Sequence, residues 1–307
     1  MERELETRPL DKDLGTSCRR MNLTSLTEGE LAPRILEKRR IADKIVLLNI
    51  NAPLIAAAAQ PGQFILIRPN EAGERIPLTI SDWEPDCGTI TIIFQEVGRS
   101  TRELGSLEIG DVILDLAGPL GKPSEIENYG SVVCVGGGVG IAVLRPIAKA
   151  LKSAGNEVTG IIGARDAGML ILEEDMREIS DHFYITTDNG SLGRKGFVSD
   201  VLKEILDIGK PVNLIFAIGP LPMMKVISDL TRPYGVRLMV SLDPIMIDGT
   251  GMCGGCRVTV GGETRLTCVD GPDFDGHLVD WEELKLRKQY YCTEESCACE
   301  GMQEEAS

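Results

Sequence analysis

The stretch Ser131-Val132-Val133-Cys134-Val135-Gly136-Gly137-Gly138-Val139-Gly140 carries the clearest fold signal in this chain of 307 residues. Its apolar, β-branched start predicts a buried strand over Ser131–Val135, and apolar residues at helical spacing predict a helix over about 141–153. Glycines between a strand and a helix let backbone N–H groups and the helix N-terminus approach a diphosphate. The spacing departs from the full G-x-G-x-x-G pattern, so a tight glycine turn without a ligand remains an alternative.

Downstream of this stretch, predicted strands and helices alternate as far as residue 242. The predicted strands cover 157–163, 183–187, 213–218 and 236–242, and the predicted helices cover 173–179, 197–206 and 221–231. Strands that alternate with helices at this spacing form a parallel, doubly wound sheet, which binds ligands at the carboxyl ends of its strands. We therefore expect an α/β nucleotide-binding domain over residues 126–242.

Glycine, small and charged residues follow several of these strands. Arg165 places a guanidinium where an adenosine ribose or its phosphate would lie, while the adjacent Asp166 would repel a 2′-phosphate, which favours NAD(H). Each loop taken singly is compatible with an ordinary turn, but together on one sheet edge they favour a dinucleotide crevice. The predicted contacts are Gly136, Gly137, Gly138, Gly140, Gly163, Arg165, Asp188, Gly219, Pro220 and Met223.

Upstream, residues 33–125 contain short strands separated by turn residues, which predicts a small antiparallel barrel. The predicted strands cover 44–50, 63–68, 77–81, 88–95 and 111–116. Two motifs offer flavin contacts: a strand hydroxyl for the ring edge, and a glycine turn with hydroxyls and an arginine for the phosphates. Each is weak alone, because a threonine on a strand is usually only a strand residue. The residues are Arg75, Pro77, Leu78 and Thr79, then Gly98, Arg99, Ser100 and Thr101.

Residues 243–285 hold a metal-ligand pattern, D-x4-C-x2-C-x11-C, formed by Asp248, Cys253, Cys256 and Cys268. Three thiolates and a carboxylate suffice to close an iron–sulfur or zinc site, and the intervening glycines favour iron–sulfur because they free backbone N–H groups for sulfur. The alternating stretch around Gly261-Gly262 predicts a β-hairpin that returns Cys268 to the loop. A zinc knuckle and a redox C-x-x-C are the alternatives.

The remaining features limit the classes of function. A net charge of −15 disfavours nucleic-acid and anionic-membrane partners. No secretory signal is visible, and nine cysteines without one indicate metal ligation in a reducing cytoplasm rather than disulfides. Residues 1–32 are read as an N-terminal extension and 286–307 as an acidic tail, where Cys292, Cys297 and Cys299 offer either a second metal site or disorder. No catalytic acid, base or nucleophile is identified.

The order of these parts resembles the ferredoxin–NADP reductase superfamily. The motifs that carry the resemblance are R-x-P-L-T at 75–79, G-R-S-T at 98–101, G-G-G-V-G at 136–140, G-P-L-P-M-M at 219–224 and the cysteine segment. Within the superfamily, the chain is similar over about residues 33–285 to two related groups. These are the electron-transfer subunits of dihydroorotate dehydrogenase and, more closely, the small (alpha) subunits of NADH-dependent ferredoxin:NADP oxidoreductase, also described as sulfide dehydrogenase subunits.

The resemblance implies FAD in the barrel, NAD(H) in the α/β domain, a [2Fe-2S] cluster in the third segment and a heterodimer with a larger flavin and iron–sulfur subunit. It also implies an electron-transfer role, with flavin-based bifurcation linking NADH, NADPH and ferredoxin. The dihydroorotate branch has cysteine where this chain has Asp248, which favours the ferredoxin:NADP side. Ile76 stands where the superfamily commonly has its flavin-site arginine, and Arg75 lies one residue earlier. A dihydroorotate dehydrogenase subunit and a non-redox, metal-stabilised binding module are the alternatives.

Overall fold

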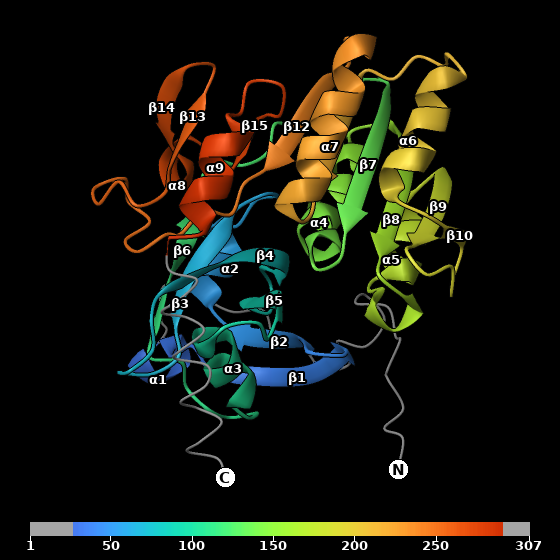
Figure 1. Ribbon diagram of the computed structural model, residues 1–307. Coiled ribbons are helices and arrows are strands. Elements are labelled where there is room, and N and C mark those ends of the chain that lie inside the picture. Colours follow the sequence, from blue (N-terminus) through green and yellow to red (C-terminus); the bar gives the residue numbers. More distant parts are fainter. Residues whose placement is uncertain (1–26, 291–307) are drawn as a thin grey trace.

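The computed structural model describes residues 27–290 as two sheets and a smaller third segment that pack together (Figure 1). One sheet is antiparallel and the other almost wholly parallel, which confirms the expected multidomain β plus α/β class. No helix within 27–290 has the length and apolar character needed to cross a membrane.

The antiparallel sheet is a six-stranded barrel at the bottom of Figure 1. It closes because the segment before the last strand bonds to the start of the first: Ile35 N donates to Asp111 O and Ile113 N to Pro33 O, both at 2.9 Å. Buried isoleucines fill the interior, because every second side chain along a strand points to the same face of the sheet. In spatial order the strands are β1 (Ile35–Ala42), β2 (Ile45–Asn51), β5 (Thr89–Gln95), β4 (Ile76–Glu84), β3 (Phe64–Arg68) and β6 (Asp115–Leu120).

Parts of the barrel differ from the prediction. β1 was absent from the predicted strands, because its central residues are charged and only its two ends, Ile35 and Ala42, are fully buried. The strand predicted over 111–116 begins instead at Asp115, since residues 111–113 form the closing contacts. Two helices were also missed: α2 (Pro53–Ala58) and α3 (Arg99–Ser106).

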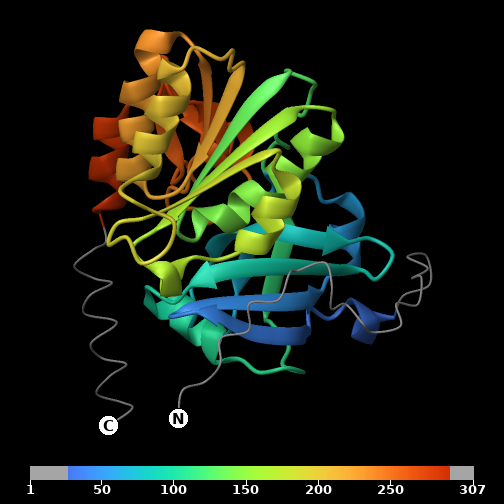
Figure 2. The ribbon, with the colours of Figure 1, turned by 90° about the vertical axis from the view of Figure 1, so that its right-hand side faces the viewer.

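The second sheet has the predicted doubly wound arrangement. Its strands in spatial order are β10 (Arg194–Lys195), β9 (His182–Thr187), β8 (Glu157–Ala164), β7 (Ser131–Gly137), β11 (Leu214–Ile218), β12 (Arg237–Ser241) and β15 (Asp273–Asp275). The face toward the barrel carries α4 (Gly140–Ser153) and α5 (Glu173–Ile179), and the opposite face carries α6 (Val198–Asp207) and α7 (Leu221–Thr231) (Figure 2). The order reverses between β7 and β11, where ligands of such sheets bind.

The third segment contains the predicted hairpin, β13 (Arg257–Val260) with β14 (Glu263–Leu266), followed by α8 (Thr267–Asp270). Neither α8 nor two further features of the segment were predicted. β15 pairs antiparallel with β12 and so joins this segment to the α/β sheet. A last helix, α9 (Trp281–Lys288), crosses the expected start of the acidic tail and packs on the hairpin.

One buried ion cluster fixes the barrel against the α/β domain. Arg145 on α4 is 1% exposed, and its guanidinium donates to Asp175 on α5 at 2.8 Å and to Asp82 on β4 at 2.9 Å. A buried charge left without its partner is strongly destabilising, so these contacts hold α4 in one position over the barrel. The glycine loop that begins α4 is thereby placed against the barrel strands.

Candidate functional site

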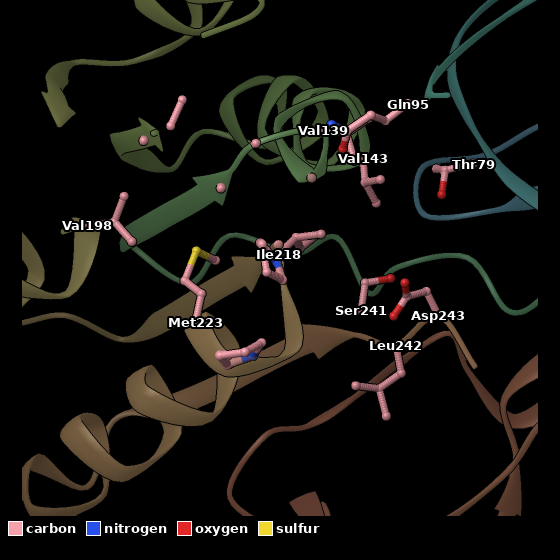
Figure 3. Close-up of a pocket in the computed structure, with 18 of the residues that line it drawn as sticks. Thr79, Gln95, Val139, Val143, Val198, Ile218, Met223, Ser241, Leu242 and Asp243 are labelled. Atoms are coloured by element: carbon pink, nitrogen blue, oxygen red, sulfur yellow. The ribbon is translucent and has the colours of Figure 1, made fainter. Parts of the chain in front are cut away.

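A pocket of about 670 Å³ lies where the barrel, the α/β domain and the third segment meet (Figure 3). The barrel contributes Thr79 and Gln95, which face across the pocket toward Val139 and Val143 at the start of α4. Ser241, Leu242 and Asp243, at the junction with the third segment, close it below. Eleven of the eighteen predicted dinucleotide contacts line this pocket: Pro77, Thr79, Gly137, Gly138, Gly140, Gly163, Arg165, Asp188, Gly219, Pro220 and Met223.

The glycine loop after β7 is packed too closely for side chains at two positions. A Cβ on Gly140 would lie 2.6 Å from Ile218 O and 2.7 Å from Gly219 Cα, and one on Gly137 would lie 2.4 Å from Met223 Sδ. Gly138 differs, because its φ is +55° and nothing lies within 4 Å of its Cβ position. The first turn of α4 thus abuts the loop after β11, while Gly138 borders open space in the pocket.

Gly136 and Leu78, also predicted as contacts, do not line the pocket. A Cβ on Gly136 would lie 3.0 Å from Ile141, so this glycine serves the packing of α4 on its strand. Leu78 packs on the barrel core, because alternation along β4 sends Pro77 and Thr79 to the opposite face.

Arg75 is also outside the pocket lining. It shares Asp115 with Arg68, with nitrogen–oxygen distances of 3.5 Å from Arg75 and 2.7 Å from Arg68. The side chain is half exposed, so this pair is a weak surface contact that leaves the guanidinium able to turn elsewhere.

The G-R-S-T motif forms the start of α3, away from the pocket lining. Gly98 is the N-cap, and Thr101 Oγ1 accepts hydrogen bonds from Val97 N and Gly98 N, both at 3.0 Å. Arg99 pairs with Glu103 at 2.8 Å, and Ser100 is almost fully buried. The Thr101 hydroxyl is therefore engaged by the backbone of its own helix.

Several pocket residues were not found from the sequence. Gln95 is the polar residue that ends the apolar run Ile92-Ile93-Phe94, and so it offered a signal. Phe64, Met246 and Pro272 offered none, because they meet at the pocket only through contacts between distant segments.

The predicted metal ligands lie as two pairs. The Asp248 carboxylate accepts from Thr250 N at 3.0 Å and Cys253 N at 2.9 Å, and these backbone hydrogen bonds lower its pKa. Cys256 and Cys268 are buried with their sulfurs 3.2 Å apart. Burial, followed by the hydrogen bond with Cys256, raises the pKa of the Cys268 thiol to about 12, so metal binding must displace its proton.

Within the described part of the chain, no three Cys, His, Asp or Glu side chains already converge as a metal site. The loop from Asp248 to Cys256, called the ligand loop below, is nonetheless suited to an iron–sulfur cluster. Gly255 N and Cys268 N already lie 3.4 Å from cysteine sulfurs, in the kind of N–H···S contact that stabilises such clusters. Gly249, Gly251 and Gly254 all have positive φ, a loop conformation that side-chain-bearing residues rarely adopt.

The ligand loop and the pocket share an apolar wall. Phe64 and Met246 both line the pocket and belong to the same buried cluster as Cys256 and Cys268. The loop also contacts the barrel directly, since a Cβ on Gly249 would lie 2.8 Å from Leu66 and from Leu120. Apolar side chains therefore separate the pocket from the sulfurs of Cys256 and Cys268.

The other cysteines have different surroundings. Cys134 is buried in β7, and burial raises the pKa of its thiol to about 12, which makes it inert. Cys87 is disulfide-bonded, so the expectation that the cysteines avoid disulfides is wrong for this residue. Cys18, Cys292, Cys297 and Cys299 lie outside the described residues.

Comparison with known protein families finds a match for the third segment. Residues 243–280 match the model of the iron–sulfur cluster binding domain of dihydroorotate dehydrogenase B. A Thermotoga maritima protein, the dihydroorotate dehydrogenase B (NAD(+)) electron transfer subunit homolog, is 48% identical over 89% of this chain and 96% of its own length. This chain belongs to that family. A probable electron transfer subunit of the same enzyme from Methanopyrus kandleri is 34% identical over 78% of this chain and 88% of its own length.

A solved structure extends the likeness to three dimensions. It is the NADH-dependent reduced ferredoxin-NADP oxidoreductase, described for its insights into flavin-based electron bifurcation. It shares 47% identity and a TM-score of 0.85, with 90% of this chain and all of that chain covered. The chain is thus a member of an oxidoreductase electron-transfer subunit family, and the expected superfamily is confirmed.

Proposed function

We propose that this chain carries electrons between NAD(H), FAD and a [2Fe-2S] cluster, and exchanges them with a larger partner subunit. The observation that carries the proposal is the apolar wall of Phe64 and Met246, which borders the pocket on one side and two ligand cysteines on the other. NADH gives electrons in pairs and a [2Fe-2S] cluster accepts one at a time, so a flavin between them supplies the conversion. The wall keeps water from the space between the two sites.

The residues fall into three roles under this proposal. The loops after β7, β8, β9 and β11 hold NAD(H), with Gly138 facing its diphosphate. Pro77 and Thr79 contact the flavin ring, and the first turn of α3 offers backbone N–H groups and Ser100 to the flavin phosphates. The iron ligands are Asp248, Cys253, Cys256 and Cys268.

Two physiological settings are compatible with this architecture. We favour a complex in which the chain links NADH with ferredoxin and NADP(H), because Asp248 stands at the first ligand position and the likeness to the bifurcating oxidoreductase covers 90% of the chain. The second is the electron-transfer subunit of a dihydroorotate dehydrogenase, favoured by the 48% identity to a homolog of such subunits. The activity of the complex with the partner that co-purifies decides between them. NADPH- and ferredoxin-linked turnover would support the first setting, and dihydroorotate oxidation would support the second.

The test of the proposal is expression of the chain alone and together with its partner. The chain alone should contain flavin and iron, and should reduce artificial acceptors with NADH but not support NADPH- or ferredoxin-linked turnover. The complex should gain that turnover. Full physiological turnover by the isolated chain would refute the subunit assignment, and absence of both flavin and iron would refute the redox assignment.

Two further expectations complete the proposal. The chain acts in the cytoplasm, where the thiols of Cys253, Cys256 and Cys268 stay reduced for iron binding; cell fractionation tests this. Its parts are a flavin barrel at 33–125, a nucleotide domain at 126–242 and a cluster segment at 243–285, with extensions at 1–32 and 286–307. Limited proteolysis tests this division, and the last cut should fall beyond α9, which ends at Lys288.

A further inference from the structure

The last described helix, α9, is anchored firmly beside the iron–sulfur ligand loop. Trp281 and Leu284 are buried against the hairpin, and Trp281 Nε1 donates to Gly276 O at 3.1 Å. The Asp280 carboxylate caps the helix by accepting from Glu283 N at 2.9 Å. The direction of α9, and so the position of its last turn, is fixed.

That last turn reaches the loop through two basic side chains. Arg287 Nη2 donates to Gly255 O, between Cys253 and Cys256, at 3.1 Å. Lys288 Nζ lies 2.5 Å from the Asp243 carboxylate, at the start of the same segment. The guanidinium is thus attached to the backbone of the ligand loop.

Arg287 also carries an unexplained donor. Its Nε is buried and has no hydrogen-bond partner among the described residues. Buried donors are almost always paired, so this one calls for an acceptor. Thiolate and sulfide sulfurs are acceptors that only the loaded site would supply, beside a side chain already bonded to the loop.

The charge of this residue has a further consequence. A guanidinium stays protonated at all accessible pH values, and the ligand set carries four negative charges once its thiols ionise. Reducing a cluster adds one electron and breaks no bond, so a nearby fixed positive charge stabilises the reduced form. Partial burial limits the screening of that charge by solvent.

We propose that Arg287 raises the reduction potential of the cluster held by Asp248, Cys253, Cys256 and Cys268, through its charge and its Nε–H donor. The inference rests on the proposed function. A basic residue in the last turn also favours the helix macrodipole, and that role alone would leave the potential unchanged. The potential therefore separates the two roles.

The experiment is an EPR-monitored redox titration of the full chain and three variants. Arg287→Gln removes both charge and Nε–H, Arg287→Lys keeps the charge alone, and Lys285→Gln removes a charge from an exposed position on the same helix. We expect Arg287→Gln to lower the reduced-to-oxidised ratio at a given potential about tenfold, a shift of about 59 mV for one electron. Arg287→Lys should show a smaller shift in the same direction, and Lys285→Gln none.

Each outcome decides something. Unchanged potentials in both Arg287 variants would overturn the inference, and so would loss of iron from them with flavin retained, since Arg287 would then hold the loop rather than tune it. If Arg287→Gln does not fold, the reduction potential of Arg287→Lys is compared with that of Lys285→Gln. A lower potential in Arg287→Lys supports the inference, and equal potentials overturn it. A wild-type chain without a [2Fe-2S] signal would instead count against the proposed function itself.

Discussion

The dinucleotide pocket and the iron–sulfur ligand loop share a wall, yet they are built in different ways. In the pocket, Gly140 lies against Ile218 O and the Gly219 backbone, which cannot move without disturbing the sheet. In the loop, Asp248 is partly exposed and Cys253 is exposed, whereas Cys256 and Cys268 are buried as a pair. The pocket is therefore set by the fold, whereas we expect the loop to reach its final form only with its ligand, at some cost in binding free energy.

The largest effect should come from the loop. Asp248→Ala leaves three thiols and removes the acceptor of two backbone N–H groups. We expect most of the iron to be lost while flavin is retained, because the pocket does not depend on the loop's final geometry. Iron and flavin content of the purified chain measure this.

A matched pair of variants sharpens the assignment. Asp248→Cys should keep the cluster and lower its potential, because thiolate donates more electron density to iron than carboxylate. Asp243→Ala should keep its iron, since Asp243 is bound to Lys288. Iron lost from the Asp243 variant but not from Asp248→Ala would make Asp243 the fourth ligand.

The next largest effect should come from Gly138→Val in the pocket. The new side chain would fill open space where the nicotinamide nucleotide diphosphate is expected, so NADH should no longer reduce the flavin at the normal rate. The flavin spectrum and the iron content should remain. Stopped-flow reduction with NADH measures the loss.

Backbone strain must be separated from this steric block. Gly235→Val is the control, because Gly235 has φ +63°, has open space at its Cβ position and lies outside the pocket lining. Gly235→Val should lower the free energy of unfolding by a similar amount, of order 1 kcal/mol or more, and should leave the rate of flavin reduction by NADH unchanged. Equal rates in the two variants would place the nucleotide elsewhere.

The sequence predicted the parts of the fold whose signals are local. The helices over 173–179 and 221–231 begin and end as predicted, because apolar spacing and flanking strands define both. The charged centre of β1 concealed a strand that tertiary pairing stabilises, and β15 is a strand of three residues that pairs with β12. Neither carries a pattern of its own.

The site follows the same division. Glycines at strand ends were predicted as pocket residues because topology alone sends the carboxyl ends of parallel strands to one edge. Phe64 and Met246, which join the pocket to the ligand loop, were missed because their meeting depends on how three segments pack. Residue spacing suggested the four candidate ligands, but not that Cys256 and Cys268 are buried while Cys253 is exposed.

A smaller effect, on the stability of the fold, is expected from a buried carboxylate where the pocket wall meets the third segment. Asp273 on β15 accepts from Ser124 at 2.5 Å, and burial raises the pKa of its carboxyl to about 6, against the opposing hydrogen bonds. Because its pKa is about 4 in the unfolded chain, protonation favours folding, so this group lowers stability as pH rises from about 4 to 6. Asp273→Asn should therefore raise the free energy of unfolding by about 1–3 kcal/mol at pH 7.5, and the gain should vanish near pH 4.

Urea unfolding at several pH values measures this dependence. Asp275→Asn, two residues along the same strand, is the control and should show no such pH-dependent gain, because that side chain is 42% exposed. If Asp273→Asn raises the free energy of unfolding equally at pH 4 and pH 7.5, the buried charge of Asp273 is not the cause of that increase.

The smallest effect should come from Thr79→Ala. Thr79 presents its hydroxyl to the pocket from β4, and under the proposed function its loss removes one hydrogen bond to the flavin, worth about 0.5–1.5 kcal/mol. FAD should then bind about two- to tenfold more weakly, while Thr79→Ser should restore most of the affinity because it keeps the hydroxyl. Since the surrounding pocket is set by the fold, the loss should stay this small and the iron content should not change. Complete loss of FAD from Thr79→Ala would show that the barrel side of the pocket, like the ligand loop, depends on its ligand for its shape.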